Sequence, residues 1–352
     1  MMNLKTIIIG AALLAGVGGY AHDFSVTLDG QRLFFDVTNK VKKTAMVTYK
    51  GSITDKQEVD VAGVIEIPSK VKHNNVVYEV TAIGQKAFAN AKRLKGVVIP
   101  SGIKSIGDFA FEGCDSLGSI VFPGNAVVLG QGVFFKCPVI ETVTVGSDWK
   151  SIDLAMFRWS DKLASLNIPA KIEKIQGLKK LTGLKSVTVD PNNGKFASYN
   201  NMLYSKDGSV LYACPRAHSG KVVVKEGTTN IHPGALIDCA GITALDFPAT
   251  LKSVSFQETS RMKGLEYILM RSETPIYTAY RNGTGCFLFQ VASKDVQIVV
   301  ASKAKGRYLE ALATETGEYA TKQSSGIPYL VTEMEMPGKK NVKGVKNFDK
   351  FN

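Results

Sequence analysis

The sequence is poor in the residues that build most catalytic and metal centres, since its 352 residues include four histidines and five cysteines. No histidine or cysteine stands in the spacing of a metal-binding motif, and the GxSxG and HExxH motifs of hydrolases are absent. The sequence therefore offers no catalytic, cofactor-binding or metal-binding residue. We expect that the protein is not an enzyme and uses no cofactor.

The chain also lacks long apolar runs, apart from one near its start. There, Lys5 precedes the apolar residues 6–17, and Gly19 and Ala21 offer small residues for cleavage. The run is too short to cross a membrane as a helix, and no cysteine marks a lipoprotein anchor. Residues 1–21 therefore predict a secretory signal peptide, and we expect a secreted, cell-surface or periplasmic protein.

A repeat of 23 residues organises the rest of the chain. Val80, Ile103, Ala126, Trp149 and Ile172 follow one another at this interval and begin segments that read alike. A fixed period of about 20–29 residues with recurring apolar positions is typical of leucine-rich repeats. Because no copy can bury its apolar face alone, the stability of each copy depends on its neighbours.

Apolar side chains recur at the same places in each copy. The clearest column, which we expect to be core, is Phe88, Phe111, Phe134 and Phe157. The end of each copy alternates in polarity and closes with Pro or Gly, a pattern typical of a short, half-buried strand followed by a turn. Stacking would place these strands in register, about 4.8 Å apart.

Cys114, Cys137 and Cys239 share one position of the repeat, which other copies fill with Ala91 and Ser160. Stacked copies would bring Cys114 and Cys137 within the range of a disulfide, and export would permit that bond. The sequence favours buried free thiols, because alanine and serine fill the same position, but it leaves the disulfide open.

The repeat breaks at residues 190–220. Asp207 and Gly208 lie between the apolar segments MLY and VLY, which is the signal of a β-hairpin with an Asp-Gly turn. We predict that this hairpin, which includes Cys214, projects from one edge of the stack.

Several segments resemble BspA-like leucine-rich repeat proteins, an exported bacterial family. They are HDFSV (22–26), VTYKG (47–51), IEIPSKV (65–71), VVYEVTAIG (76–84), the GC and KC dipeptides ending at Cys114 and Cys137, and DPNN…LYSKDGSVLYACP (190–215). The resemblance covers about residues 23–336 and implies a right-handed α+β solenoid with a parallel sheet on its concave side. Some members of the family bind host matrix proteins or other bacteria, but no motif encodes that activity, so no site residue is carried over.

The repeat and the resemblance together predict the organisation of the chain. It comprises a signal peptide (1–21), an N-terminal β cap (22–64), a leucine-rich repeat solenoid (65–336) with the hairpin insertion (190–220) and a strand–helix C-terminal cap (295–336), and a basic tail (337–352). The tail holds five lysines but one carboxylate, Asp349, and such a charge run is typical of a disordered segment.

The strand residues that should point away from the core form the candidate binding face. In order along the chain they are Glu66, Val98, Val121, Thr144, Asn167, Thr188, Val223, Asp246, Leu269 and Val299. The eight from Val98 to Leu269 are the predicted partner-binding residues. Most are short and β-branched, which also suits an open pleated surface without any ligand.

From this pattern we expect a monomeric, exported binding or adhesion protein that recognises a protein or glycan at or outside the cell envelope. An alternative is an electrostatic binder of an anionic glycan or envelope polymer, which would use the lysine-rich tail and the formal charge of +12. A second alternative is a cryptic exported enzyme. Nucleic acid is the least expected partner, because the chain is predicted to be exported.

Overall fold

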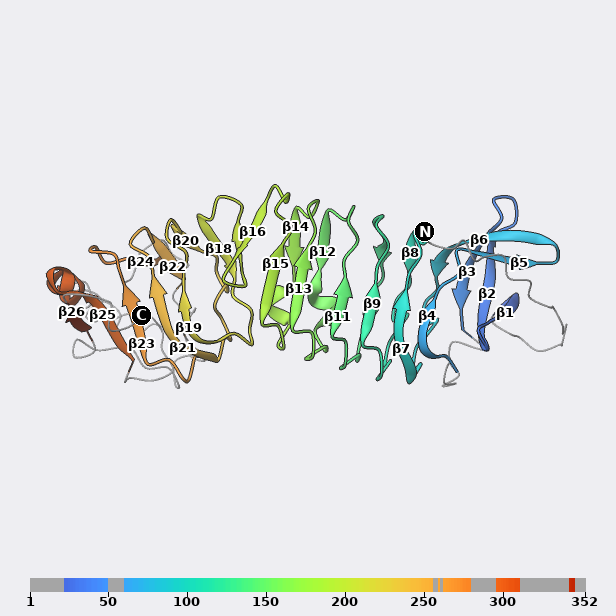
Figure 1. Cartoon of the computed structure of the whole chain (residues 1–352), viewed down its shortest axis with the longest axis horizontal. Coiled ribbons are helices and arrows are strands. Elements are labelled where there is room, and N and C mark those ends of the chain that lie inside the picture. Colours follow the sequence, from blue (N-terminus) through green and yellow to red (C-terminus); the bar gives the residue numbers. More distant parts are fainter. Residues whose placement is uncertain are drawn as a thin grey trace, which may run out of the picture. The chain divides into compact units, whose positions relative to one another are not determined.

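The structure is a computed structural model that describes residues 22–49, 60–255, 259, 262–279, 296–310 and 342–345. The predicted signal peptide lies outside these residues. The chain divides into two compact units, residues 1–183 and 184–352, and each is a stack of short strands that follow one another in sequence order (Figure 1).

An antiparallel meander begins the described part of unit 1. Its strands are β1 (Phe24–Leu28), β2 (Gln31–Asn39) and β3 (Thr44–Thr48). Asp29 and Gly30 join β1 to β2 with φ angles of 47° and 80°, the left-handed conformation that a two-residue hairpin turn requires. Across this hairpin, Phe24 pairs with Phe35, and their stacked rings lie 5.4 Å apart between centroids.

Each repeat of unit 1 then contributes strands to two parallel sheets. One sheet continues from β3 through β6 (Val76–Ile83), β8 (Ser105–Ile106) and β10 (Val128–Leu129), with β5 (Lys70–His73) antiparallel to β6. The other holds β4 (Ala62–Glu66), β7 (Arg93–Val98), β9 (Ser119–Val121) and β11 (Thr142–Thr144). Val97 pairs with Ile120 and Ile120 with Val143, so residues 23 positions apart are neighbours. The predicted in-register stacking is therefore confirmed.

The last coils of unit 1 add short helical turns to the same pattern. Their elements are β12 (Ser151–Asp153), the 3-10 turn η1 (Leu154–Phe157), β13 (Ser165–Ile168), β14 (Lys174–Gln176) and the 3-10 turn η2 (Leu178–Lys180). The Asp153 carboxylate caps η1 by accepting the Ala155 backbone N–H at 2.9 Å. This is the usual function of an aspartate at a helix start, where backbone donors lack partners.

The core of unit 1 is a ladder of phenylalanine rings, as the sequence predicts. Phe88, Phe111, Phe134 and Phe157 are at most 1% exposed. Successive ring centroids are 5.1, 5.4 and 5.3 Å apart and the planes are nearly parallel, at 6°, 15° and 19°. Each ring therefore packs against its equivalents in the neighbouring coils, in the offset-stacked range that aromatic pairs favour.

The cysteine position forms a second interior column. The Cys114 thiol donates to the Phe88 carbonyl at 3.1 Å, and the Cys137 thiol donates to the Phe111 carbonyl at 3.0 Å. Ser160, at the same position one coil later, donates its hydroxyl to the Cys137 carbonyl at 3.0 Å. The side chains thus donate hydrogen bonds to buried backbone carbonyls, which explains why both cysteine and serine are found at this position. Both thiols are free and buried, as the sequence favours.

Buried thiols should not react with thiol reagents while the protein is folded. A hydrogen bond with the neighbouring Cys137 thiol, together with burial, raises the pKa of Cys114, and the thiolate is the reactive form. In a Cys286→Ser variant, which removes the cysteine outside the described residues, we expect Ellman's reagent at pH 8 to react at least about 100-fold more slowly in native buffer than in guanidinium, because reaction requires opening of the core. Equal rates in the two solvents would contradict this burial.

Unit 2 begins with the predicted hairpin region, but the strands do not project from an edge. The strands are β15 (Ser186–Val189), β16 (Phe196–Tyr199), β17 (Met202–Ser205) and β18 (Val210–Ala213). The Asp-Gly turn between β17 and β18 is present, and hydrogen bonds from the Ser205 hydroxyl and from Ser209 lower the pKa of Asp207 to about 2. However, β18 pairs in parallel with β20 (Asn230–Ile231), and Tyr204 and Leu211 lie in the core. The hairpin is part of the stack because its strands are rich in apolar residues, which bury against the neighbouring coils.

The same integration places Cys214 in the core rather than in an exposed hairpin. Its carbonyl lies 3.7 Å from the Cys239 thiol, and both cysteines are free and buried. Unit 2 therefore repeats the paired-thiol arrangement of Cys114 and Cys137, although only Cys239 fits the repeat in the sequence.

The remaining strands of unit 2 again form two sheets. One is β19 (Ser219–Val223), β21 (Gly241–Phe247), β23 (Tyr267–Met270), β25 (Gln297–Ala301) and β26 (Val342–Val345), all parallel; the other continues from β20 through β22 (Ser253–Ser255) and β24 (Tyr277–Ala279). The 3-10 turn η3 (Ser302–Ala304) and helical residues 305–310 follow β25. β26 lies within the segment predicted as a disordered basic tail, and these four residues instead extend the sheet.

Candidate binding surfaces

The outward face of the β4–β7–β9–β11 sheet carries the predicted binding residues of unit 1. Val98 pairs with Val121 and Val121 with Thr144, so the three side chains follow one another across the strands. Val121 is 37% exposed, Thr144 is exposed and Val98 is half-buried. We refer to these three residues as the sheet face. Asn167 in β13 is also exposed.

The predicted binding residues of unit 2 are divided between surface and interior. Thr188 and Val223 are exposed. By contrast, Asp246 is 1% exposed and Leu269 has no exposed surface. These two positions are in register with Val223, as the sequence predicts, but they are not at the surface and are not available for contact with a partner.

An ion-pair cluster explains the burial of Asp246. The Arg271 guanidinium binds its carboxylate with two hydrogen bonds, of 2.6 Å from Nε to Oδ1 and 2.8 Å from Nη2 to Oδ2. The Lys221 ammonium lies 3.3 Å from Oδ2. A buried carboxylate requires such partners, because losing its hydration is costly. Asp246 therefore links three successive coils of unit 2 and has a structural role.

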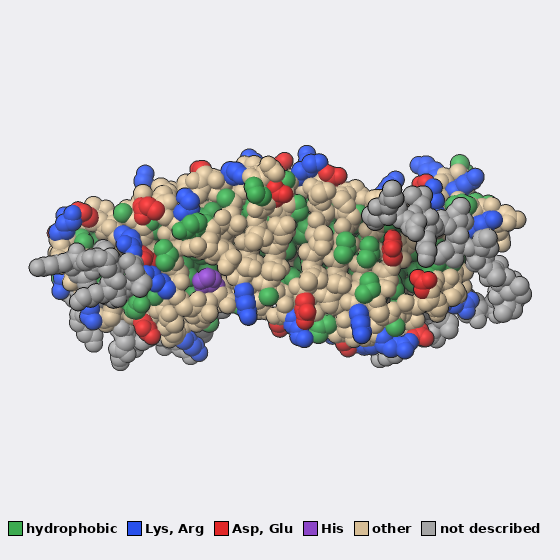
Figure 2. Space-filling model, in the orientation of Figure 1, with side chains coloured by type: hydrophobic (Ala, Val, Ile, Leu, Met, Phe, Trp, Pro, Cys, Tyr) green, Lys and Arg blue, Asp and Glu red, His purple; other side chains and the backbone are tan. Residues whose placement is uncertain are grey.

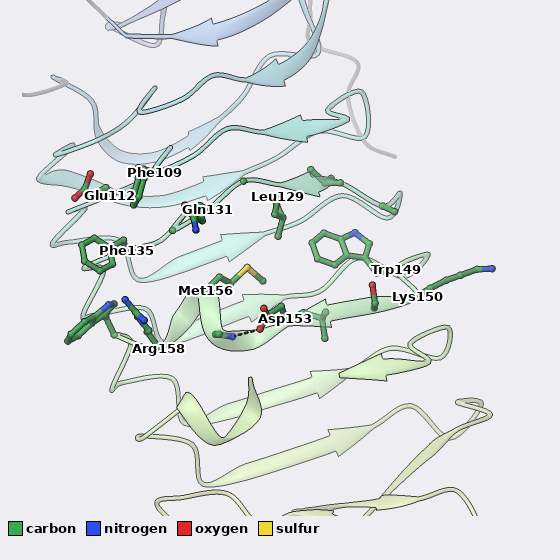
Figure 3. Close-up of a pocket in the computed structure, with 18 of the residues that line it drawn as sticks. Phe109, Glu112, Leu129, Gln131, Phe135, Trp149, Lys150, Asp153, Met156 and Arg158 are labelled. Atoms are coloured by element: carbon green, nitrogen blue, oxygen red, sulfur yellow. Dashed lines mark hydrogen bonds between the residues drawn. The ribbon is translucent and has the colours of Figure 1, made fainter. Parts of the chain in front are cut away.

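A groove of about 1220 Å³ lies elsewhere on unit 1. Its lining comes from β10, β12, η1 and turns of successive coils, including those after β6 and β8, rather than from the sheet face. Figure 3 shows Phe109, Phe135 and Arg158 at one end, Leu129 and Met156 in the middle, and Trp149 at the other end. The middle thus combines apolar side chains with the polar Gln131 and Asp153, and the aromatic end holds both Arg158 and Glu112.

Three aromatic side chains from successive coils form this end, and we call them the aromatic stripe: Phe109, Phe135 and Trp159. The ring centroids of Phe109 and Phe135 are 6.2 Å apart at an interplanar angle of 79°, and those of Phe135 and Trp159 are 5.9 Å apart at 84°. Trp159 is 46% exposed, whereas Phe109 and Phe135 are half-buried. Perpendicular contacts of this kind are favourable for aromatic pairs.

Two cations lie over the aromatic stripe. The Arg158 guanidinium carbon is 5.7 Å from the Phe135 ring centroid and 5.4 Å from that of Trp159. The Lys136 ammonium is 5.3 Å from the Phe135 centroid. All three distances are within the range of cation–π attraction, so the ring faces attract the two positive charges.

Phe109 adopts a backbone conformation that is uncommon for its residue type. Its φ is +55°, and the equivalent positions in neighbouring coils, Lys86 and Gly132, have φ values of 55° and 58°. Glycine suits this left-handed conformation, whereas a bulky side chain rarely adopts it. A methyl group on Gly132 would lie 2.6 Å from the Phe109 ring, so the ring packs directly on the glycine of the next coil. The fold thus holds an aromatic side chain at the groove at some conformational cost.

Sequence reasoning missed the groove, although it contained a signal. At the position of Phe135 other copies have Ala89, Glu112 and Arg158, and at the position of Trp159 they have Asn90, Gly113 and Lys136. Large aromatic residues at turn positions that are otherwise small or polar indicate a local surface feature rather than core.

The described residues hold neither a metal cluster nor a membrane-spanning helix. Within them, no group of three or more His, Cys, Asp and Glu side chains is placed to bind a metal ion. In the same part of the chain, no helix has the length and apolar character needed to cross a membrane. Figure 2 shows Lys and Arg side chains at many separate places on the face drawn, with uncharged surface between them.

Comparisons with known proteins agree on the repeat architecture. Residues 75–204 match the family described as BspA type leucine rich repeat region, in six copies. No curated protein matches the sequence.

Solved structures similar to this chain include leucine-rich proteins of bacteria. The pneumococcal vaccine antigen PcpA has 16% identity over 82% of this chain and 96% of its own, with a TM-score of 0.44. A leucine-rich cell surface protein from Faecalibacterium prausnitzii has 18% identity over 79% and 89%, with a TM-score of 0.41. A leucine-rich repeat protein from Bacteroides ovatus has 16% identity over 76% and 77%, with a TM-score of 0.41. At these scores the similarity carries no inference about function.

Proposed function

Because this chain carries BspA-type leucine-rich repeats over residues 75–204, a scaffold that is not typically enzymatic, we propose that it acts by binding. Its partner is a protein or glycan at or outside the cell envelope, and the protein reaches that location by export. The observation that supports this proposal most directly is the sheet face, where equivalent side chains of successive coils are in register and accessible.

The sheet face has the character of a contact surface rather than of a catalytic one. Val98, Val121 and Thr144 carry no titratable group, and an apolar surface with a polar surround is typical of sites that bind macromolecules. Short side chains on consecutive strands leave a smooth surface on which an extended partner can lie. Because β7 and β9 are paired on both sides and β11 is paired with β9, this surface is preorganised and loses little conformational entropy on binding.

The proposal predicts that charge placed on the sheet face abolishes binding. The full-length protein is tested by surface plasmon resonance against immobilised fibronectin, laminin and collagen, and on a glycan array. We expect Val121→Lys combined with Thr144→Lys to weaken the binding observed for the wild type by at least about tenfold, because two ammonium groups would have to be desolvated at the contact.

The control variant is Val41→Lys, a valine that is 92% exposed in the turn after β2, and it should bind as the wild type does. Unchanged binding by the sheet-face variant, or no binding by the wild type to any of these probes, would refute the proposed function at this surface.

A further inference from the structure

The groove of unit 1 provides a second contact site that differs from the sheet face in position and chemistry. We propose that it binds an extended, acidic peptide segment of a partner protein, with an apolar side chain of the peptide against the aromatic stripe and a carboxylate against Arg158. This inference does not depend on the sheet face, because the lining residues belong to other strands and turns.

The composition of the site favours a protein partner. Trp159, Phe135, Met156 and Arg158 lie together at the groove, and Trp, Phe, Met and Arg are the residue types enriched at protein interfaces and their energetic hot spots. Trp159 is 46% exposed and adjoins the half-buried ring of Phe135, and a contiguous exposed apolar surface is typical of protein contact sites.

The arrangement of the rings disfavours a carbohydrate. Adjacent rings of the stripe are perpendicular, at 79° and 84°, so they offer no continuous flat surface on which successive sugar rings could stack. Arg158 and Lys136 also lie over ring faces that a sugar would need. Perpendicular rings leave gaps between them, and these gaps fit separate aliphatic or aromatic side chains instead.

The charges of the site favour an acidic segment. Among the described residues, no carboxylate is ion-paired with Arg158 or Lys136. A guanidinium that lies over a ring keeps its N–H edge free, and that edge can hold a carboxylate by two hydrogen bonds. Three carboxylates line the groove. Asp148 is paired with Lys171 at 2.5 Å, and Asp153 caps η1. Glu112 lies beside Phe109 at the aromatic end (Figure 3), so the two cations over the stripe outnumber the one carboxylate at this end.

The length of the site sets the length of the segment. The aromatic stripe crosses three coils, or roughly 10 Å at the strand spacing of about 4.8 Å. An extended peptide rises about 3.3 Å per residue, so about three residues cover the stripe. The minimal segment consequently carries an acidic residue within one or two positions of a large apolar one.

The test is selection of peptides by the full-length protein from a random seven-residue phage-display library. We expect enriched sequences to place Asp or Glu within two positions of Phe, Leu or Pro. A labelled synthetic peptide of the enriched sequence should bind in a fluorescence anisotropy titration. Its affinity should fall at least about tenfold in Arg158→Ala and in Trp159→Ala, because such anchors dominate small contact areas.

The matched control is Arg93→Ala, which removes an exposed arginine of β7 that lies outside the groove and should leave the affinity unchanged. Arg158→Glu should bind a peptide in which lysine replaces the acid, an exchange that a variant with a disturbed fold could not show. Melting temperatures of all variants are measured alongside.

Three results would overturn the inference: enrichment of peptides without an acidic residue, no enrichment at all, or an affinity that Arg158→Ala and Trp159→Ala do not change. Binding of an acidic oligosaccharide on a glycan array, lost in Trp159→Ala, would assign the groove to a carbohydrate instead. The sheet-face variant should bind the peptide normally, so failure of this inference and failure of the proposed function are separable.

Discussion

Replacement of Phe111 by alanine is expected to lower the free energy of unfolding by about 3–5 kcal/mol, the usual cost of truncating a buried phenylalanine. The ring has no exposed surface and lies between Phe88 and Phe134, with centroids 5.1 and 5.4 Å away. The cavity would therefore open between three coils at once. The stability of stacked repeats depends on contacts between neighbours, so loss of these contacts weakens two coil interfaces.

The matched control lies two residues away in the same coil. Phe109→Ala removes a half-buried ring whose backbone has φ +55°, and we expect it to cost less than about 1 kcal/mol. Guanidinium unfolding of both variants, followed by circular dichroism, makes the comparison. Equal losses for Phe111→Ala and Phe109→Ala would mean that the phenylalanine ladder is not the core of unit 1.

The second large effect is expected at Asp246. Its replacement by alanine leaves Arg271 and Lys221 without the carboxylate that they share. Removing one partner of a buried ion pair typically costs about 3–5 kcal/mol, because the remaining charge is uncompensated. We expect a loss of this size in guanidinium unfolding of Asp246→Ala.

Two comparisons isolate the electrostatic cause at Asp246. Asp148→Ala breaks the exposed ion pair with Lys171 and should cost at most about 1 kcal/mol. The triple variant Lys221→Met, Asp246→Leu and Arg271→Met replaces all three charges by apolar groups and should be more stable than Asp246→Ala alone. A triple variant less stable than the single one would show that packing, rather than unpaired charge, causes the loss.

The sequence predicted the interior of the stack well, because the interior is what the repeat specifies. A period of 23 residues determines which side chains meet, and the pairing of Val97 with Ile120 and the stacking of Phe88 on Phe111 agree with it. The paired position of Cys137 was predictable for the same reason. Cys214 was not, because the hairpin preceding it shifts the chain out of the repeat.

The sequence predicted the surface less well, because the repeat says which side of a strand faces outward but not what covers that side. Val121 and Asp246 occupy equivalent strand positions, yet one is accessible and the other is buried beneath Arg271 and Lys221. The aromatic stripe was missed for a related reason. Phe135 and Trp159 differ from the residues at the same positions of the other copies, so the consensus of the repeat does not indicate the surface that they form.

The register of the coils also has a mechanical consequence. Each coil of unit 1 packs 23 residues into roughly 4.8 Å of stack height, whereas the same residues pulled straight span about 80 Å. If tension unfolded one coil at the end of the stack, that coil would lengthen many times over while the coils behind it stayed folded.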